Sequence, residues 1–388
     1  MTAGLIEADN LLAYSAGVRE YLASTPDLDR WRGLHHGTTE DRITSHARLI
    51  GELYRAGWNR YGWPVDAGGL GGDERHRAVL YDALSAAGLP VPEPYLMLET
   101  LGPPLLRFAP ALAAEVVPAY LRGEEWWGQG FSEPDAGSDL AGLRTRATRD
   151  GDVYRVEGQK IWTSHGATAR RLVCLVRTGT PAERHRGLTM LMVDTDAPGV
   201  SVRPIGLASG RNELAEIFLD DVQVPTNRLI GAEGQGWAVA MYLLQFERAM
   251  FAWLSAAVAL RRLRELRAQA TQSPLPDGAT SRFGACYADL IALRSRSAAT
   301  VRRLAAGEPV GPEASVDKIL LGQLETDLHD LARDIPGTGF LLRPDPDADT
   351  WRADWWYSRA ATIMGGSAEV QRTILADHVL GLPRERTA

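Results

Sequence analysis

The feature of this 388-residue chain that most constrains its fold is a run of short strand-like segments with no helix between them. These segments are rich in Val, Leu, Ile and Thr and are bounded by Asp-Gly, Ala-Pro-Gly or Asp-Asp turns; they cover residues 153–156, 171–177, 188–193, 200–205 and 215–219. Consecutive strands without crossover helices predict an antiparallel barrel or sandwich. The βαβ architecture that usually binds dinucleotides is therefore excluded.

Helical patterns flank this β region on both sides. Apolar residues recur at three- and four-residue spacing in segments 43–56 and 77–87, and Gly/Pro clusters such as 101–104 are expected to separate the N-terminal helices. After the β region we expect one long helix at 236–265, further helices at 282–306, 312–333 and 369–379, and a Gly-, Pro- and Asp-rich loop at 336–350.

This order predicts an α+β chain of three domains. They are an N-terminal helical domain (1–122), a middle β domain (123–228) and a C-terminal helical domain (229–388).

Composition excludes several function classes. The net charge of -7 with no long basic tract argues against nucleic acid as a partner. Two cysteines, Cys174 and Cys286, cannot form a disulfide framework or a four-cysteine metal site, and they suit a reducing, cytoplasmic location. The first ten residues lack a basic segment before an apolar one, and no uninterrupted apolar run approaches about 20 residues. We therefore expect no secretory signal, no membrane insertion and no metal.

Two segments carry candidate binding groups. Residues 127–139, W-G-Q-G-F-S-E-P-D-A-G-S-D, must turn sharply and could offer backbone N–H groups and hydroxyls to polar ring edges or phosphates, although a plain polar loop explains them too. In residues 157–166, Trp162 could stack on a flat aromatic ligand while Ser164 bonds its edge. Simple packing of Trp162 is the alternative.

Taken together, these motifs resemble the acyl-CoA dehydrogenase family over nearly the whole chain. The matching stretches are S-E-P-D-A-G-S-D, K-I-W-T-S, and the terminal M-G-G-S-A-E-V-Q-R before L-G-L-P-R. The resemblance implies an N-terminal helical domain, a middle antiparallel β-barrel or sandwich and a C-terminal four-helix bundle. It also implies FAD between the last two domains, and oxidation of an acyl-CoA to the 2,3-enoyl-CoA.

The resemblance further implies which residues contact cofactor and substrate. The FAD contacts would be Gln129, Phe131, Ser132, Ser138, Trp162, Thr163, Ser164, Ser367, Ala368 and Glu369. The family usually carries Thr where Ser132 stands. The acyl-CoA contacts would be Ser138, Gln245, Arg248 and Gly366.

A base must remove the weakly acidic α-proton while hydride passes to flavin N5, and its pKa must be raised by burial. In many relatives a Glu occupies the position of Gly365 here. A minority supplies Glu from the long helix of the C-terminal domain, in an E-R pair that Glu247-Arg248 matches. We expect Glu247 to be the base, with Arg248 positioning it, since Gly365 leaves room. The alternative is that Glu247 and Arg248 form a solvated ion pair on the helix surface. The apolar neighbours of Glu247 disfavour it.

One departure from the family bears on assembly. The Arg that usually reaches the FAD of an adjacent subunit is Thr280 here; Arg282 could replace it only from a direction turned by about 200°. The family's downstream Gln is Ile291, and 337–354 replaces a glycine-rich segment. Three hypotheses follow: a homo-oligomeric dehydrogenase oxidised by an electron-transferring flavoprotein; a subunit of a heteromeric complex sharing its FAD site; or an acyl-carrier-protein dehydrogenase or acyl-CoA oxidase.

Overall fold

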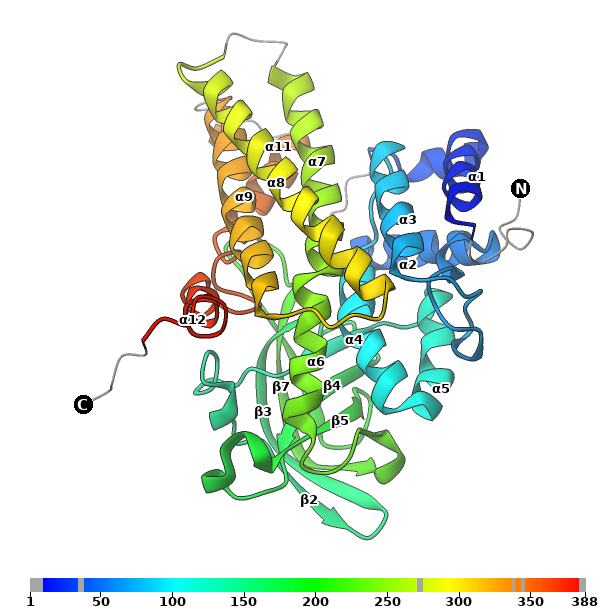
Figure 1. The fold of residues 1–388 in the computed structure, drawn as a ribbon, viewed down its shortest axis with the longest axis vertical. Helices are drawn as coiled ribbons and strands as arrows, with labels where there is room; N and C mark the ends of the chain where they lie inside the picture. The colour runs from blue at the N-terminus through cyan, green and yellow to red at the C-terminus, as the bar shows by residue number, and fades with distance from the viewer. Residues whose placement is uncertain (1–9, 34–37, 271–274, 337–338, 343–345, 384–388) are drawn as a thin grey trace.

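The computed structural model describes residues 10–33, 38–270, 275–336, 339–342 and 346–383. Figure 1 shows the N-terminal helices beside the C-terminal helices, with the sheet below both. The helix–sheet–helix order confirms the predicted α+β class.

The N-terminal part consists of α1 (Leu11–Ser24), α2 (Thr39–Arg55), α3 (Glu74–Ala86), α4 (Pro94–Phe108) and α5 (Pro110–Leu121). The side chains of Asn10, Thr38 and Asp73 cap α1, α2 and α3 by accepting hydrogen bonds from backbone N–H groups of the first turn.

The expected helix boundary at 101–104 is wrong, because these residues lie inside α4. Pro103 and Pro104 cannot donate backbone hydrogen bonds, but both are buried. Gly102 packs against Trp63: a Cβ at Gly102 would lie 2.9 Å from the indole atom Cζ3. Close packing thus keeps the chain helical through a sequence that would break an exposed helix.

The middle part is one mixed sheet, mainly antiparallel. Its strands are β1 (Trp127–Gly130), β2 (Arg146–Asp150), β3 (Val153–Ser164), β4 (Arg171–Arg177), β5 (Leu188–Asp194), β6 (Val200–Ile205), β7 (Leu214–Pro225) and β8 (Leu229–Ile230). The order is β6-β7-β3-β2-β4-β5-β8, with β1 beside β4. The expectation of purely antiparallel pairing needs one correction: β1–β4 and β2–β4 pair in parallel.

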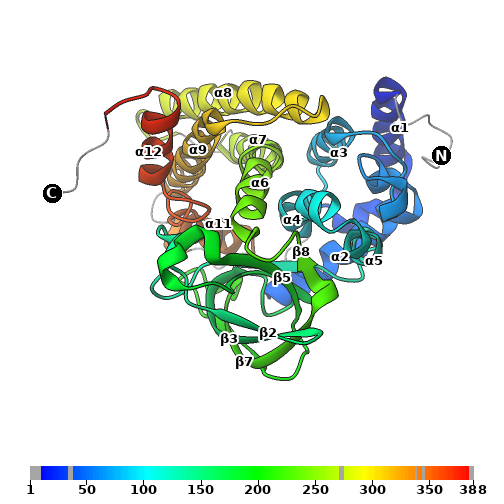
Figure 2. The same cartoon turned by 60° about the horizontal axis from the view of Figure 1, so that its bottom comes forward.

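The C-terminal part consists of α6 (Gly236–Arg248), α7 (Met250–Ala270), α8 (Ala279–Ala305), α9 (Ser315–Asp334), α10 (Gly339–Leu342), α11 (Pro346–Ser358) and α12 (Ala368–His378). Figure 2 shows α6 between the sheet and the other helices, and α6 contacts β4 and β5. By length and composition, Gly236–Ala270 is apolar enough to cross a membrane, which the sequence reading did not expect. Half of that stretch is buried and it packs on α3, α4, α8 and α9, as a core helix does.

Two further expectations need correction. The long helix at 236–265 breaks at Ala249, whose φ of -108° and ψ of -81° are not helical. The break directly follows Glu247 and Arg248. The loop predicted at 336–350 contains α10 and the start of α11, apart from 337–338 and 343–345, which lie outside the described residues.

Candidate active site

A buried ion pair fixes the loop after β1. Lys160 on β3 is fully buried, and its Nζ donates hydrogen bonds to Glu133 Oε1 at 2.8 Å and to the carbonyl of Phe131 at 3.2 Å. Glu133 also accepts the backbone N–H groups of Arg144 and Thr145. Burial acts to raise the pKa of Glu133, but the Lys160 ammonium and these donors outweigh it and lower that pKa. The loop is thereby held in one shape by groups that the sequence reading missed.

The candidate residues of this first segment differ in exposure. Gln129 on β1 and Ser132 are half-buried, Phe131 is buried and Ser138 is exposed. The carbonyl of Ser132 accepts the N–H of Ile161 at 2.9 Å, which ties the loop to β3. The two predicted binding segments therefore lie side by side.

Trp162 has a strained backbone and an exposed side chain. Its φ of 62° is left-handed, which is rare for a bulky residue, and it sits where the β3–β7 register shifts between Lys160 and Thr163. Its indole is 55% exposed. Such strain costs about 1–3 kcal/mol and is typical of binding sites. An open aromatic face at this bulge fits the flat ring of a flavin.

The residues after Trp162 alternate in direction. Thr163 is fully buried and its methyl group packs at Gly128, where a Cβ would lie 2.9 Å from Thr163 Cγ2. Its hydroxyl has no partner among the described residues. Ser164 is half-buried. A cofactor contact by Thr163 would therefore come from its backbone, whereas Trp162 and Ser164 can use their side chains.

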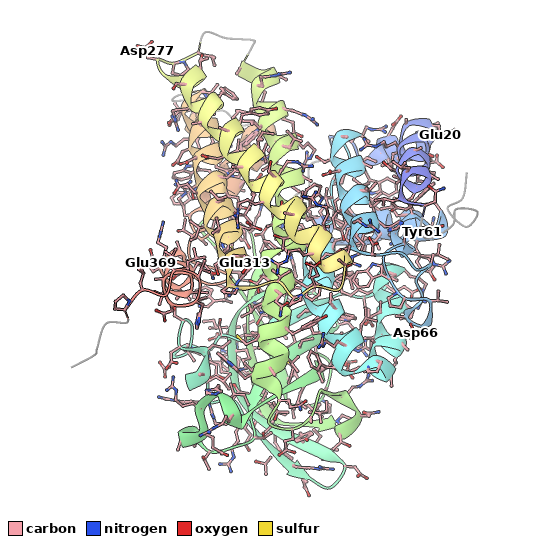
Figure 3. The ribbon with its side chains drawn as sticks, in the orientation of Figure 1. Glu20, Tyr61, Asp66, Asp277, Glu313 and Glu369 are labelled. Atoms are coloured by element: carbon pink, nitrogen blue, oxygen red, sulfur yellow. The ribbon has the colours of Figure 1, made fainter. Side chains whose placement is uncertain are left out.

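The terminal motif forms the start of α12, which packs on α9 at the side of the molecule (Figure 1). Ser367 caps this helix by accepting the N–H of Val370 at 3.3 Å. Ala368 is half-buried, and Glu369 is exposed at the edge of the molecule (Figure 3). Backbone N–H groups at such a helix start favour anionic or polar ligand atoms.

Glu247 and Gly365 are brought together. A Cβ at Gly365 would lie 2.6 Å from Glu247 Oε1, so this carboxylate occupies the space that a side chain would fill. Its other oxygen, Oε2, is buried without a partner in the described part of the chain. Burial raises the pKa of Glu247, and the positive charges of Arg248 and Lys318 oppose that rise. A desolvated carboxylate with a raised pKa is a suitable proton acceptor.

The other two candidates on α6 differ in their contacts. Gln245 Oε1 accepts the N–H of Val310 at 3.3 Å, which ties α6 to the segment before α9. Arg248 is half-buried, and its Nε has no partner within the described residues. Burial lowers the pKa of Arg248, and the nearby Glu247 carboxylate opposes this.

Two residues beside the Gly365–Gly366 turn were not predicted. Lys318 on α9 lies next to Gly365 and Glu247: its Cε is 3.4 Å from a Cβ built at Gly365, and its Nζ donates to the carbonyl of Ala361 at 2.6 Å. Gln371 on α12 is fully buried and faces Gly366, with neither amide atom bonded to a described residue. Lysine scarcity was a usable signal: of the two lysines in the chain, Lys160 anchors the loop after β1 and Lys318 lies at this turn.

Comparison with known proteins shows the family of this chain. Residues 128–222 match the acyl-CoA dehydrogenase middle domain, and residues 234–380 match the acyl-CoA dehydrogenase C-terminal domain. The acyl-CoA dehydrogenase IpdE1 of Mycobacterium tuberculosis is 37% identical over 359 residues, 91% of each chain. This chain belongs to the acyl-CoA dehydrogenase family. It is thus an oxidoreductase of a flavoprotein family whose members use FAD.

Solved structures with the same fold include two described by paired names. One is the Tcur3481-Tcur3483 steroid ACAD, with a TM-score of 0.81 at 28% identity, covering 97% of this chain and 98% of that one. The other is the ChsE4-ChsE5 complex from Mycobacterium tuberculosis, with a TM-score of 0.78 at 27% identity, covering 98% of this chain and all of that one.

Proposed function

We propose that the enzyme is an FAD-dependent acyl-CoA dehydrogenase that converts an acyl-CoA thioester to the 2,3-enoyl-CoA, with Glu247 as the base. The observation that carries this proposal is the Glu247 carboxylate filling the space above Gly365. In relatives with Glu at that position the carboxylate comes from the turn itself; here it comes from α6. The reacting α-carbon would be reached from a different helix at the same point.

FAD would be held by the residues that fit it and would accept the hydride from the β-carbon. On the β domain these are Gln129, Phe131, Ser132, Ser138, Trp162, Ser164 and the backbone of Thr163, and on the C-terminal domain Ser367, Ala368 and Glu369.

The thioester would lie along Gly366, with Ser138, Gln245 and Arg248 as further contacts. Glu247 takes the α-proton onto its carboxylate. Because Oε2 is desolvated, gaining a proton there removes a buried charge, which favours the transfer.

Anaerobic flavin reduction by a panel of short, branched, long and ring-bearing acyl-CoAs tests this proposal. We expect Glu247→Gln to reduce its flavin at least about a thousandfold more slowly, since it removes the only proton acceptor in the scheme. Glu20→Gln is the matched control, because Glu20 lies on α1 far from the site (Figure 3). A Glu247→Gln enzyme that reacts at the parental rate would disprove the base assignment.

The residues of α8 support a second arrangement. In it, the chain is part of a heteromeric complex and another chain completes the FAD site. Thr280 replaces the subunit-crossing Arg, and Arg282 donates to Asp334 of its own chain at 2.6 Å instead of standing free. Tyr287 and Ile291 on the same helix are exposed apolar residues that a partner would cover.

Purification alone and together with a related chain distinguishes these assemblies. The heteromer predicts a small species with little FAD when alone, and full flavin occupancy on coexpression. Full occupancy in a homo-oligomer would contradict it. Electron-transferring flavoprotein is the proposed oxidant; rapid hydrogen peroxide formation, or activity only on carrier-bound acyl groups, would instead favour the oxidase or carrier-protein alternatives.

A further inference from the structure

A line of charge leads away from the base along α9. Lys318 lies against Gly365 beside Glu247, and Glu325 follows seven residues later. Seven residues make almost two complete helical turns, so Lys318 and Glu325 share a face of α9 about 10 Å apart along its axis. Each acts electrostatically on the other, and Lys318 also acts on Glu247. A substrate that places its α-carbon at Glu247 would meet Lys318 first, and an acyl group that extends along this face of α9 would also meet Glu325.

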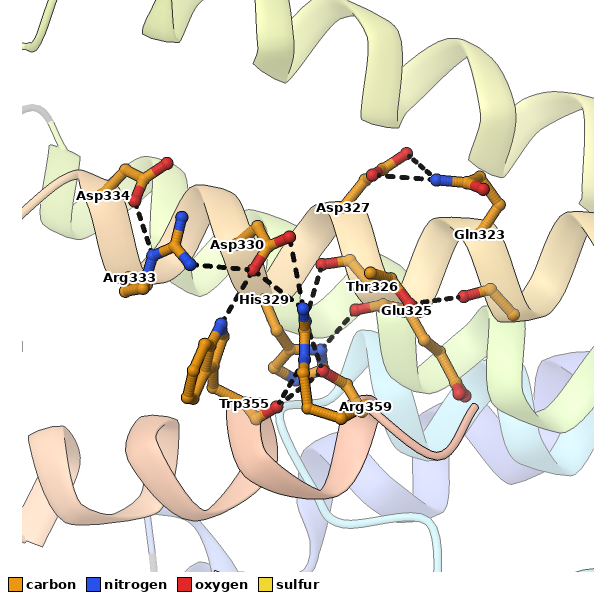
Figure 4. A network of polar contacts seen from close by, with 12 residues as sticks. Gln323, Glu325, Thr326, Asp327, His329, Asp330, Arg333, Asp334, Trp355 and Arg359 are labelled. Carbon is orange, nitrogen blue, oxygen red and sulfur yellow. Dashed lines mark hydrogen bonds and ion pairs between the residues drawn. The ribbon is translucent and has the colours of Figure 1, made fainter. Parts of the chain in front are cut away.

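These groups are poorly satisfied by the protein itself. Lys318 has three N–H donors, and the described residues accept only one, at the Ala361 carbonyl. The Glu325 carboxylate has no hydrogen bond within the described structure. Figure 4 shows it extending away from the network of α9 and α11, with only its backbone carbonyl engaged, by His329. Burial raises the pKa of Glu325 to about 7, against the opposing charge of Lys318.

A third polar group comes from α11, which packs on α9. The hydroxyl of Tyr357 likewise makes no hydrogen bond to a described residue; burial raises the pKa of this phenol, and the charges of Glu213, Glu93 and Glu325 raise it further. The Tyr357 hydroxyl thus adds one donor and one acceptor without a described partner to the charges of Lys318 and Glu325. Two helices contribute to this cluster of Lys318, Glu325 and Tyr357, which we call the polar cluster.

A surface made of these polar side chains is unfavourable for a hydrocarbon. Pockets for alkyl chains are predominantly apolar, and a saturated chain next to the polar cluster would desolvate its groups without supplying hydrogen bonds. An oxygenated acyl group would restore them: a hydroxyl can donate to Glu325, and a hydroxyl or ketone oxygen can accept from Lys318 Nζ. Sites built to bond a substrate oxygen discriminate strongly against analogues that lack it.

We propose that the polar cluster selects acyl-CoA substrates whose acyl group carries a hydroxyl or oxo group near the reacting carbons. This inference rests on the proposed function, because it takes Glu247 as marking the α-carbon. Lys318 and Glu325 act here as specificity-determining residues and take no part in proton or hydride transfer.

The test compares cyclohexane-1-carbonyl-CoA with its 3- and 4-hydroxy and 3- and 4-oxo derivatives. In the parental enzyme we expect kcat/KM for flavin reduction to favour at least one oxygenated ring by about tenfold or more. Lys318→Met and Glu325→Leu should each reduce that ratio at least about fivefold, and Glu325→Gln should retain part of it. Asp327→Asn is the control on α9, since Asp327 bonds Gln323 on the exposed side.

Ratios within one variant cancel losses of folded or flavin-loaded protein. Equilibrium binding of the same thioesters to Glu247→Gln, by calorimetry, measures the preference without turnover. A binding preference without flavin reduction in the parental enzyme would overturn the proposed function alone. A parental preference for the plain ring, or ratios unchanged in both Lys318→Met and Glu325→Leu, would overturn the polar cluster as a selector.

Discussion

At the scale of single residues, the missing side chain of Gly365 decides where the carboxylate of Glu247 can lie. The two positions are more than a hundred residues apart in sequence, yet a single added methyl group would collide with Oε1. Gly365 also has a φ of +67°, which L side chains rarely adopt. A glycine here allows the turn and leaves the space that the Glu247 carboxylate fills.

Gly365→Ala should therefore lower the rate of flavin reduction by about tenfold to a hundredfold, because displacing a base by about 1 Å has effects of that size. Gly88→Ala is the matched control: Gly88 has a similar φ of +72°, but nothing lies within 4 Å of an added Cβ. Comparing the rates of the two variants at equal flavin content distinguishes the collision with Glu247 from the strain that any side chain causes at a positive φ. Equal losses in both variants would contradict a steric role for Gly365.

The pH dependence of the rate would report the charge state of Glu247, the proposed base. In the proposed mechanism, proton abstraction requires ionised Glu247. Burial raises the pKa of this residue, so kcat should fall as the pH drops through that raised value. Lys318 holds the pKa down; Lys318→Met should therefore move the acidic limb to higher pH. Stopped-flow reduction across pH 5–9 (roughly the stable range of most proteins) measures this. An unmoved limb would show that Lys318 does not act on Glu247.

At the scale of elements, strand β3 carries both Lys160, which anchors the loop after β1, and the exposed Trp162. Lys160 points inward to Glu133, and two residues later the left-handed bulge turns Trp162 outward. Because the register shifts between Lys160 and Thr163, these two side chains of one strand point in different directions. The buried pair of Lys160 and Glu133 thus holds the loop after β1 in place, and it lies on the same strand as Trp162.

Lys160→Met should destabilise the protein by about 3–5 kcal/mol, because it leaves Glu133 buried without its cation. Flavin content should fall with it, since Glu133 also holds the backbone of Arg144 and Thr145. Thermal unfolding with and without added FAD measures both effects. The double variant Lys160→Met/Glu133→Leu should recover part of the stability; no recovery would mean that the pair is not the origin of the loss.

At the scale of the whole molecule, the residues of the proposed site come from distant segments. Strand β3 supplies Trp162, α6 supplies Glu247, and the turn before α12 supplies Gly365. The break at Ala249 ends α6 at Arg248, one residue after Glu247, the proposed base. In the proposed mechanism, movement between the sheet and the C-terminal helices would alter the distance between Trp162 and Glu247.

Much of this was readable along the chain. The strand run predicted the α+β class and the motifs predicted the family, and both are confirmed. The assignment of Glu247 as the base, which the resemblance implies because position 365 lacks Glu, remains a prediction. These features are local: composition, periodicity and short motifs act within a few residues. The domain limits 1–122, 123–228 and 229–388 remain predictions of the same kind.

Tertiary structure alone decided the rest. The contact of Glu247 with Gly365, the ion pair that engages Arg282, and the unsatisfied groups of Lys318 and Glu325 each depend on which helices pack together. So does the continuation of α4 through Pro103 and Pro104, which packing stabilises against their local tendency. Whether a charged side chain is solvated or buried is a property of its neighbours in space, and no pattern in its own segment determines it.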